Sequence, residues 1–116
     1  MAEIRDALPR DAIVTAEGET IMGICRAMLP SYVNRSRLNA GTTGCMGVGA
    51  PYVVGSALAC PDRLSVGVLG DYAFGAAAMV VETAARVGAN PVFIVVNNEG
   101  VAGHMLQDMY LSLIHI

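Results

Sequence analysis

The chain has 116 residues, enough for one domain with a buried core but fewer than most complete enzymes have. Hydrophobic residues make up 54% and charged residues 15% of it, and the mean hydropathy is +0.53, so we expect partners to cover part of the apolar surface. The net charge of −3, with seven arginines and no lysine, argues against nucleic-acid binding and excludes a Walker-type phosphate loop.

No apolar run reaches the ~18 residues that a membrane helix needs, and the charged N-terminus does not resemble a signal peptide. We therefore expect a cytoplasmic protein that does not enter a membrane. The three cysteines, Cys25, Cys45 and Cys60, are widely spaced and odd in number, which indicates mostly buried thiols and neither disulfides nor a zinc site. Cys45, in a glycine-rich loop, is the only one of them that could be exposed to a ligand.

Short apolar runs alternate with helical patterns along the chain. The runs are rich in β-branched residues and too short for helices, which is typical of parallel strands covered on both faces. This alternation predicts a three-layer α/β/α fold around a mainly parallel sheet, here as an incomplete domain. In chain order, the expected elements are a helix ending near residue 10, a strand at 12–15, a helix at 21–29, a helix at 51–59, a strand at 64–69, a helix at 74–87 and a strand at 92–96.

A glycine-rich loop over residues 41–49 separates the second and third expected helices. Such a loop allows a ligand to lie directly against the backbone, although a flexible connector has the same composition. Two residues argue against a mere connector. Met46 stands among the glycines where no core packing is expected, and Pro51 opens an Ala- and Val-rich helix soon afterwards.

The last two expected strands and the helix between them form one right-handed βαβ unit. The turns that follow these strands, at Asp71 and at Asn97-Asn98, therefore leave the same carboxyl edge of the sheet. Asp71, Asn98 and the backbone carbonyl of Gly100 offer the hard oxygen ligands that Mg²⁺ takes beside a phosphate. The helix that opens at Ala73 points its free N–H groups at the same place, so we expect a diphosphate site with a metal ion.

Here the sequence resembles a known family. Gly70-Asp71, a gap of the usual length and then Asn97-Asn98 are similar to the signature of thiamine diphosphate-dependent enzymes. The resemblance covers nearly all of residues 1–110 and implies the C-terminal, cofactor-binding domain of a three-domain enzyme, a homodimer or homotetramer when intact. The family takes its activating glutamate from an N-terminal domain, so the resemblance implies no catalytic residue in this chain.

The resemblance also implies roles for single residues. Met46 would wedge beneath the cofactor and hold it bent, and the carbonyl of Gly44 would accept a hydrogen bond from its 4′-amino group. Asp71, Asn98 and Gly100 would bind Mg²⁺. The other cofactor-binding residues would be Thr20, Gly70, Tyr72 and Ala73.

Three segments, 37–42, 44–49 and 70–75, look most like oxalyl-CoA decarboxylase and 2-hydroxyacyl-CoA lyase, with acetolactate synthase next. The implied substrate is a small 2-oxoacid or an acyl-CoA. In all of these enzymes the cofactor acts as an electron sink while a C–C bond breaks or forms.

Three residues depart from the family pattern. Tyr72 stands where Ser or Gly is usual, and Glu99 stands where Gly is frequent. Glu19 replaces a small residue near the diphosphate, which it would repel by about 1 kcal/mol in a solvated contact. These departures leave the substrate and the activity open.

Two hypotheses of other classes remain. A nicotinamide-binding Rossmann domain would need Gly-x-Gly-x-x-Gly directly after its first strand, whereas Gly44 to Gly49 follow no convincing strand. A non-catalytic interaction module is the other hypothesis.

Three smaller features lie in the second half of the chain. Glu82 and Arg86 lie four residues apart in a helical segment and should form a surface ion pair. Residues 101–110 suit a loop and the start of a helix. Residues 111–116 match the translation of a transposon-end sequencing adapter, so we expect read-through there.

Overall fold

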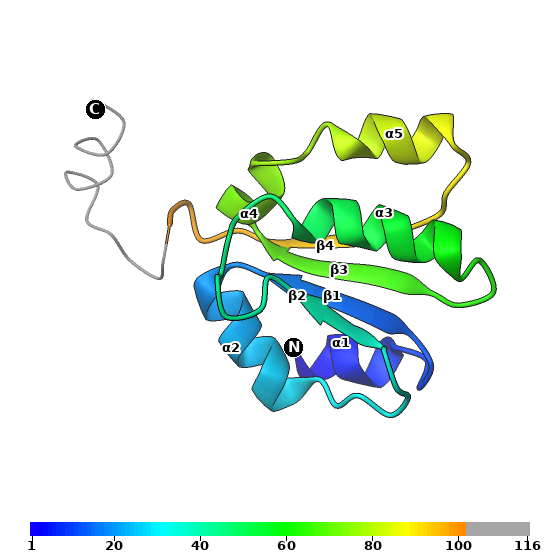
Figure 1. Ribbon diagram of the computed structural model, residues 1–116. Coiled ribbons are helices and arrows are strands. Elements are labelled where there is room, and N and C mark those ends of the chain that lie inside the picture. Colours follow the sequence, from blue (N-terminus) through cyan, green and yellow to red (C-terminus); the bar gives the residue numbers. More distant parts are fainter. Residues whose placement is uncertain (102–116) are drawn as a thin grey trace.

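A computed structural model describes residues 1–101 and shows helices on both faces of a central sheet (Figure 1). The four strands lie in the order β2-β1-β3-β4, and every neighbouring pair is parallel. The elements are α1 (Ala2–Ala7), β1 (Ile13–Glu17), α2 (Glu19–Met28), β2 (Arg37–Asn39), α3 (Gly49–Ala59), β3 (Ser65–Gly70), α4 (Asp71–Gly75), α5 (Val80–Arg86) and β4 (Val92–Val96). The predicted α/β/α fold with a parallel sheet is confirmed. The expectations for residues 102–116 lie outside the described residues.

Alternate residues of β3 face the two helical layers, as a fully covered strand requires. Val66 and Val68 belong to the core cluster shared with α2. On the opposite face, the hydroxyl of Ser65 donates to the carbonyl of Val53 in α3 at 2.8 Å. Each fully buried aliphatic side chain contributes about 1.5–3 kcal/mol, so the two helical layers hold β3 firmly in the middle of the fold.

Gly67 allows α3 to lie close to β3. A Cβ atom built on Gly67 would lie 2.7 Å from Cγ2 of Val53, which is closer than two carbon atoms can pack. The missing side chain therefore sets the distance between the sheet and α3.

The sequence did not indicate β2, which pairs with β1 in the register Val14 to Arg37. A three-residue strand at the edge of the sheet, polar at Arg37 and Asn39, has no apolar run to mark it. Long-range hydrogen bonds hold this edge instead. The guanidinium of Arg63 donates to the carbonyl of Asp11 at 2.7 Å and to the hydroxyl of Ser36 at 2.8 Å.

The prediction of one continuous helix over residues 74–87 is wrong. The segment contains the end of α4 and the separate helix α5, joined by turns at residues 76–79. In these turns the hydrogen bonds are of the tighter three-residue type, such as Val80 N–H to the carbonyl of Ala77 at 3.0 Å. Gly75 disfavours a continuous helix, and the small alanines after it give the segment little side chain to pack on the sheet.

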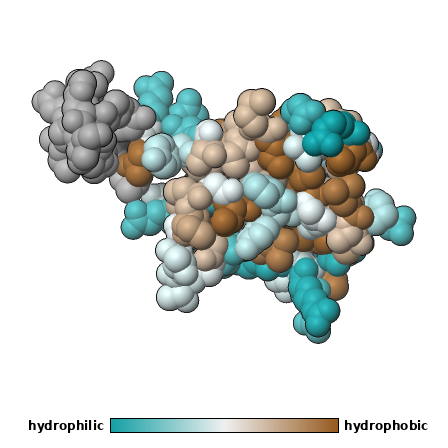
Figure 2. Space-filling view, turned by 45° about the horizontal axis from the view of Figure 1, so that its top comes forward, coloured by the Kyte–Doolittle hydropathy of each residue, from teal (hydrophilic) through white to brown (hydrophobic). Residues whose placement is uncertain are grey.

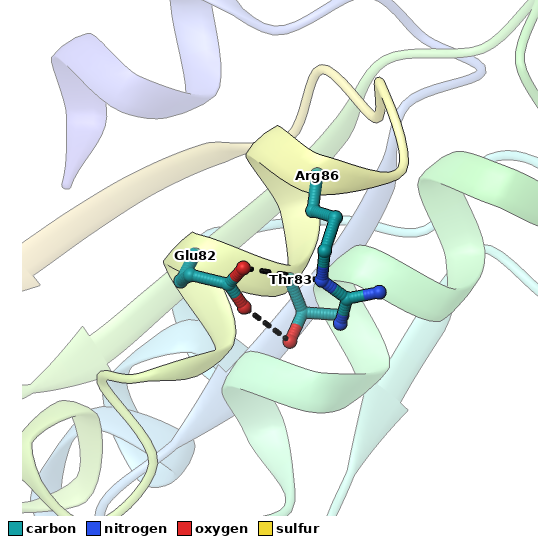
Figure 3. Close-up of polar contacts among 3 residues, drawn as sticks. All are labelled: Glu82, Thr83 and Arg86. Atoms are coloured by element: carbon teal, nitrogen blue, oxygen red, sulfur yellow. Dashed lines mark hydrogen bonds and ion pairs between the residues drawn. The ribbon is translucent and has the colours of Figure 1, made fainter.

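The expected surface ion pair is present on α5. Glu82 and Arg86 point toward one another (Figure 3), with Nε of Arg86 3.1 Å from Oε1 of Glu82. Both side chains are more than half exposed, so the pair contributes no more than about 0.5 kcal/mol.

The cysteines differ from the expectation of mostly buried thiols. Cys25 is buried in α2, but Cys45 is exposed and Cys60 is only partly buried. Burial raises the pKa of the Cys25 thiol, because the charged thiolate is poorly solvated there.

The side of the molecule that carries α5 and β4 exposes large apolar side chains. Met79 is 81% exposed, and Val81 and Val87 also face outward. Figure 2 turns this side forward and shows apolar residues spread over much of it. Valines of β4 are exposed as well, and no strand of the described part of the chain covers its outer edge. Within residues 1–101, each helix is too short or too polar to cross a bilayer.

Candidate functional site

A cavity of about 470 Å³ lies at the carboxyl edge of the sheet. The chain leaves β1 toward one side of the sheet to form β2, and then crosses to the other side to form β3 and β4. The carboxyl edge between β1 and β3 is therefore a topological switch point, the usual ligand site of open parallel sheets. The volume suits a small molecule or cofactor.

All nine residues that the sequence assigned to cofactor or metal binding line this one cavity. They come from four segments that are far apart in the chain: the start of α2, the glycine loop, the β3–α4 junction and the turn after β4. They are Thr20, Gly44, Met46, Gly70, Asp71, Tyr72, Ala73, Asn98 and Gly100. The structure therefore brings them together, while the role of each stays a prediction.

The β3–α4 junction positions Asp71. Gly70 ends the strand in an extended conformation and Asp71 already begins the helix, two residues earlier than the sequence suggested. The first turn after β1 lies against this junction, since a Cβ atom on Gly18 would be 3.4 Å from the backbone nitrogen of Gly70. Gly18 has φ of +105°, which a residue with a side chain rarely adopts.

The turn after β4 brings Asn98 to Asp71. One end of the Asn98 amide lies 3.0 Å from Oδ1 of Asp71 and 2.9 Å from the carbonyl oxygen of Gly100. With its nitrogen at this end, the amide donates to both oxygens. This orientation satisfies the hydrogen bonds of the chain by itself, whereas a cation bound here would turn the amide oxygen toward the other two oxygens.

This donor set fits Mg²⁺. A carboxylate, an amide oxygen and a backbone carbonyl are hard ligands, which Mg²⁺ prefers together with phosphate oxygens. Groups of three His, Cys, Asp or Glu side chains able to hold a metal are absent from residues 1–101. Within that range, the Asp71, Asn98 and Gly100 oxygens are the best candidate for a metal site.

A strained turn shapes the Asn98 segment. The backbone N–H of Glu99 donates to Oδ1 of Asn97 at 2.7 Å. Glu99 has φ of +57°, in the left-handed region that favours glycine. This turn folds the chain back, so that the Asn98 side chain and the Gly100 carbonyl reach the same point.

The glycine loop forms another wall of the cavity. Gly41, Gly44 and Gly47 all have positive φ values, between +62° and +89°, so its path depends on glycine. Met46 is partly buried and faces the cavity together with Gly44. Cys45 is exposed to solvent, but it is not part of the cavity wall.

Two of the three departures from the family pattern also line the cavity. Glu19 is exposed at the start of α2, and Tyr72 is 50% exposed in α4. Both side chains can therefore turn partly toward solvent. Glu99 is not part of the wall.

The sequence did not assign several apolar residues of the cavity wall. They are Ile21, Met22, Ile24, Val96 and Val101. A signal for the first three was available, because the turn after β1 must leave the same sheet edge as the turns after β3 and β4. The sequence assigned these three residues only to the helix expected at 21–29.

Comparison with known proteins identifies the family. Residues 18–110 match the family described as thiamine pyrophosphate enzyme, C-terminal TPP binding domain. Among curated proteins, the chain is 46% identical over 107 residues to 2-hydroxyacyl-CoA lyase of Arabidopsis thaliana, covering 89% of this chain and 19% of the relative. It is 31% identical over 103 residues to oxalyl-CoA decarboxylase of Escherichia coli K12, covering 87% and 18%.

Comparison with solved structures points to the same family. The solved structure of a thiamine diphosphate-dependent 4-hydroxybenzoylformate decarboxylase from Rhodococcus jostii RHA1 superimposes with a TM-score of 0.77 and 29% identity, over 84% of this chain and 18% of that one. The chain spans about a fifth of the length of the curated relatives that it matches. The chain therefore belongs to the thiamine pyrophosphate enzymes and carries their C-terminal cofactor-binding domain.

Proposed function

We propose that this chain binds thiamine diphosphate through Mg²⁺, as part of an enzyme that breaks a C–C bond in a 2-oxoacid or an acyl-CoA. The observation that carries the proposal is the convergence of the Asp71 carboxylate, the Asn98 amide and the Gly100 carbonyl at the wall of one cavity. Relatives named as lyases and decarboxylases favour these reactions over an acetolactate synthase-like carboligation.

Different residues of the cavity would bind the metal and the diphosphate of the cofactor. Asp71, Asn98 and Gly100 would hold Mg²⁺, and the backbone around Thr20 and at Gly70 to Ala73 would receive the diphosphate. The cofactor supplies a nucleophilic carbon and an electron sink.

The rest of the wall would receive the rings of the cofactor. Met46 and the Gly44 carbonyl would orient them, and apolar neighbours such as Ile21 and Val96 would keep water from that part of the site.

We also propose that residues 1–110 are part of the C-terminal domain of a longer chain and that residues 111–116 derive from an adapter. The activating glutamate would come from an N-terminal domain, across a dimer interface. The apolar surface of α5 and β4 supports this arrangement, since further parts of the enzyme would cover it (Figure 2). The present chain alone should therefore show no turnover.

The first strand–helix junction argues against the nicotinamide hypothesis. β1 ends at Glu17 and α2 begins at Glu19, so no Gly-x-Gly-x-x-Gly turn lies between them. The glycine loop follows β2 instead.

Thermal unfolding of the purified chain tests the proposal. Thiamine diphosphate should raise the melting temperature only when Mg²⁺ is present, because Asp71 would hold the metal that neutralises the diphosphate. A ligand at 100 times its dissociation constant stabilises a protein by about 2.7 kcal/mol, which such a measurement detects easily. Stabilisation by NAD⁺, or by neither ligand, would overturn the proposal.

A further inference from the structure

Glu17, the last residue of β1, has a side chain that is completely buried in the layer between the sheet and α3. Carboxylates are almost never fully buried without partners, because losing their hydration is costly. Oε1 accepts a hydrogen bond from the backbone N–H of Val48 at 2.9 Å, whereas Oε2 has no hydrogen-bond partner among residues 1–101. The site described above does not use this carboxylate, and its burial calls for an explanation.

The hydrogen-bond partner of Glu17, Val48, lies where the glycine loop meets α3. Val48 is the residue before α3, and it ends the glycine loop that carries Gly44 and Met46. Glycines with positive φ values shape this loop, and glycine backbone is conformationally permissive. The hydrogen bond from Val48 to Glu17 therefore fixes the end of the loop to the sheet.

The start of α3 is shaped to receive the carboxylate. A Cβ atom on Gly49 would lie 2.7 Å from both Cβ and Oε2 of Glu17, so only glycine leaves the carboxylate its place. Glu17 thus lies at the N-terminus of an eleven-residue helix, where the helix dipole favours negative charge.

The main chain of Glu17 leads into another wall of the cavity. It continues directly into Gly18, Glu19 and Thr20, all of which line the cavity. Glu17 therefore connects two walls of the cavity. Its backbone continues into the turn after β1, and its side chain accepts a hydrogen bond from the end of the glycine loop. A displacement of the Glu17 carboxylate would shift the two walls relative to each other.

We infer that Glu17 is a positioning residue, which holds Gly44 and Met46 at the place where they contact the rings of the cofactor. The inference rests on the proposed function, because it takes the cavity to be a thiamine diphosphate site. Glu17 itself is not part of the cavity wall.

A comparison of two ligands tests this role. Glu17→Ala removes the acceptor for Val48, whereas Glu17→Gln keeps a side chain of the same length with an acceptor oxygen. Each variant is titrated, with Mg²⁺ present, with thiamine diphosphate and with inorganic pyrophosphate, which lacks the rings. For Glu17→Ala we expect about a tenfold weaker binding of thiamine diphosphate, the effect of one lost hydrogen bond, with pyrophosphate binding nearly unchanged. Glu17→Gln should restore most of the affinity.

Equal loss of both ligands in Glu17→Ala, or no loss of either, would overturn the inference. Gly49→Ala provides an independent variant, because it should displace the carboxylate without changing Glu17. Its effect should not add to that of Glu17→Ala, since both substitutions break the same contact.

Amide hydrogen exchange of the ligand-free chain provides a second test that does not depend on cofactor binding. In Glu17→Ala, exchange should accelerate at Val48 and in the loop before it, more than in β1 or β3. The control, Val53→Ala, weakens the same core from α3 without touching the loop bond, so its effect should be uniform. A uniform acceleration in Glu17→Ala as well would overturn the inference. If exchange accelerates locally in Glu17→Ala but the wild-type chain does not bind thiamine diphosphate, the proposed function is overturned. The conclusion that Glu17 holds the end of the glycine loop would remain valid.

Discussion

The amide of Asn98 lies 3.0 Å from Oδ1 of Asp71, although the two residues follow different strands and are separated by α4 and α5. β3 and β4 are parallel neighbours in the register Gly70 to Val96, so the turns that follow them start side by side. The proposed metal site rests on this juxtaposition of two short turns. It also gives the sharpest test of the proposed function.

Asp71→Ala should abolish the Mg²⁺-dependent stabilisation by thiamine diphosphate. The substitution removes the one charged ligand of the proposed metal site and leaves only neutral oxygens. Calorimetric titration with Mg²⁺ and thiamine diphosphate measures the loss. Asp62→Ala, which removes an exposed acidic residue in another turn, is the matched control and should bind like the wild type. Unchanged binding by Asp71→Ala would rule out this metal site.

Gly67→Ala should destabilise the fold by about 1–3 kcal/mol, because its Cβ atom would overlap Cγ2 of Val53. Chemical denaturation gives the free energy of unfolding. The double variant with Val53→Ala should recover part of the loss, since the shorter side chain makes room for the new methyl group. If the two substitutions destabilised the chain additively, the tight contact between α3 and β3 would not be the cause.

Glu99→Gly should stabilise the chain by about 0.5–1 kcal/mol, because glycine adopts positive φ values without the strain of a side chain. Arg35, with φ of +58°, provides a comparison outside the site. Arg35→Gly should give a similar gain in the free energy of unfolding. Only Glu99→Gly changes the turn that presents Asn98, so only this variant should also alter Mg²⁺ binding. A loss of stability in both variants would show that the strain is not significant.

Alkylation should distinguish the thiols of Cys25 and Cys45. Burial raises the pKa of the Cys25 thiol above its ordinary value of 9.0, so at pH 8 the folded chain exposes little thiolate there. Cys45 is exposed and should react first with iodoacetamide, as followed by mass spectrometry. Because the folded state raises the pKa of Cys25, its contribution to stability is present below pH 9.0 and is lost as the pH rises beyond it. Rapid labelling of Cys25 at pH 8 would contradict its burial.

The apolar runs and the spacing of the motifs were sufficient to predict three strands and the edge of the sheet that carries the site. The strands expected at 64–69 and 92–96 are observed as β3 at Ser65–Gly70 and β4 at Val92–Val96. Short β-branched runs identify covered strands by themselves, and the right-handed crossover between them is nearly obligatory. This connection places Asp71 and Asn98 at the same edge of the sheet.

Local pattern could not reveal the features that depend on contacts between distant segments. The polar edge strand β2 has no apolar signal of its own, and the break between α4 and α5 reflects weak packing on the sheet rather than a helix-breaking proline. The orientation of the Asn98 amide depends on the oxygens that meet it. The hydrogen bond from Val48 to Glu17 joins residues 31 positions apart in the chain. The sequence alone determined the positions of β3 and β4, because a short β-branched run forms a covered strand from neighbouring residues. Only the tertiary structure decided which buried groups meet across the layers, because burial brings together residues that are not neighbours in the sequence.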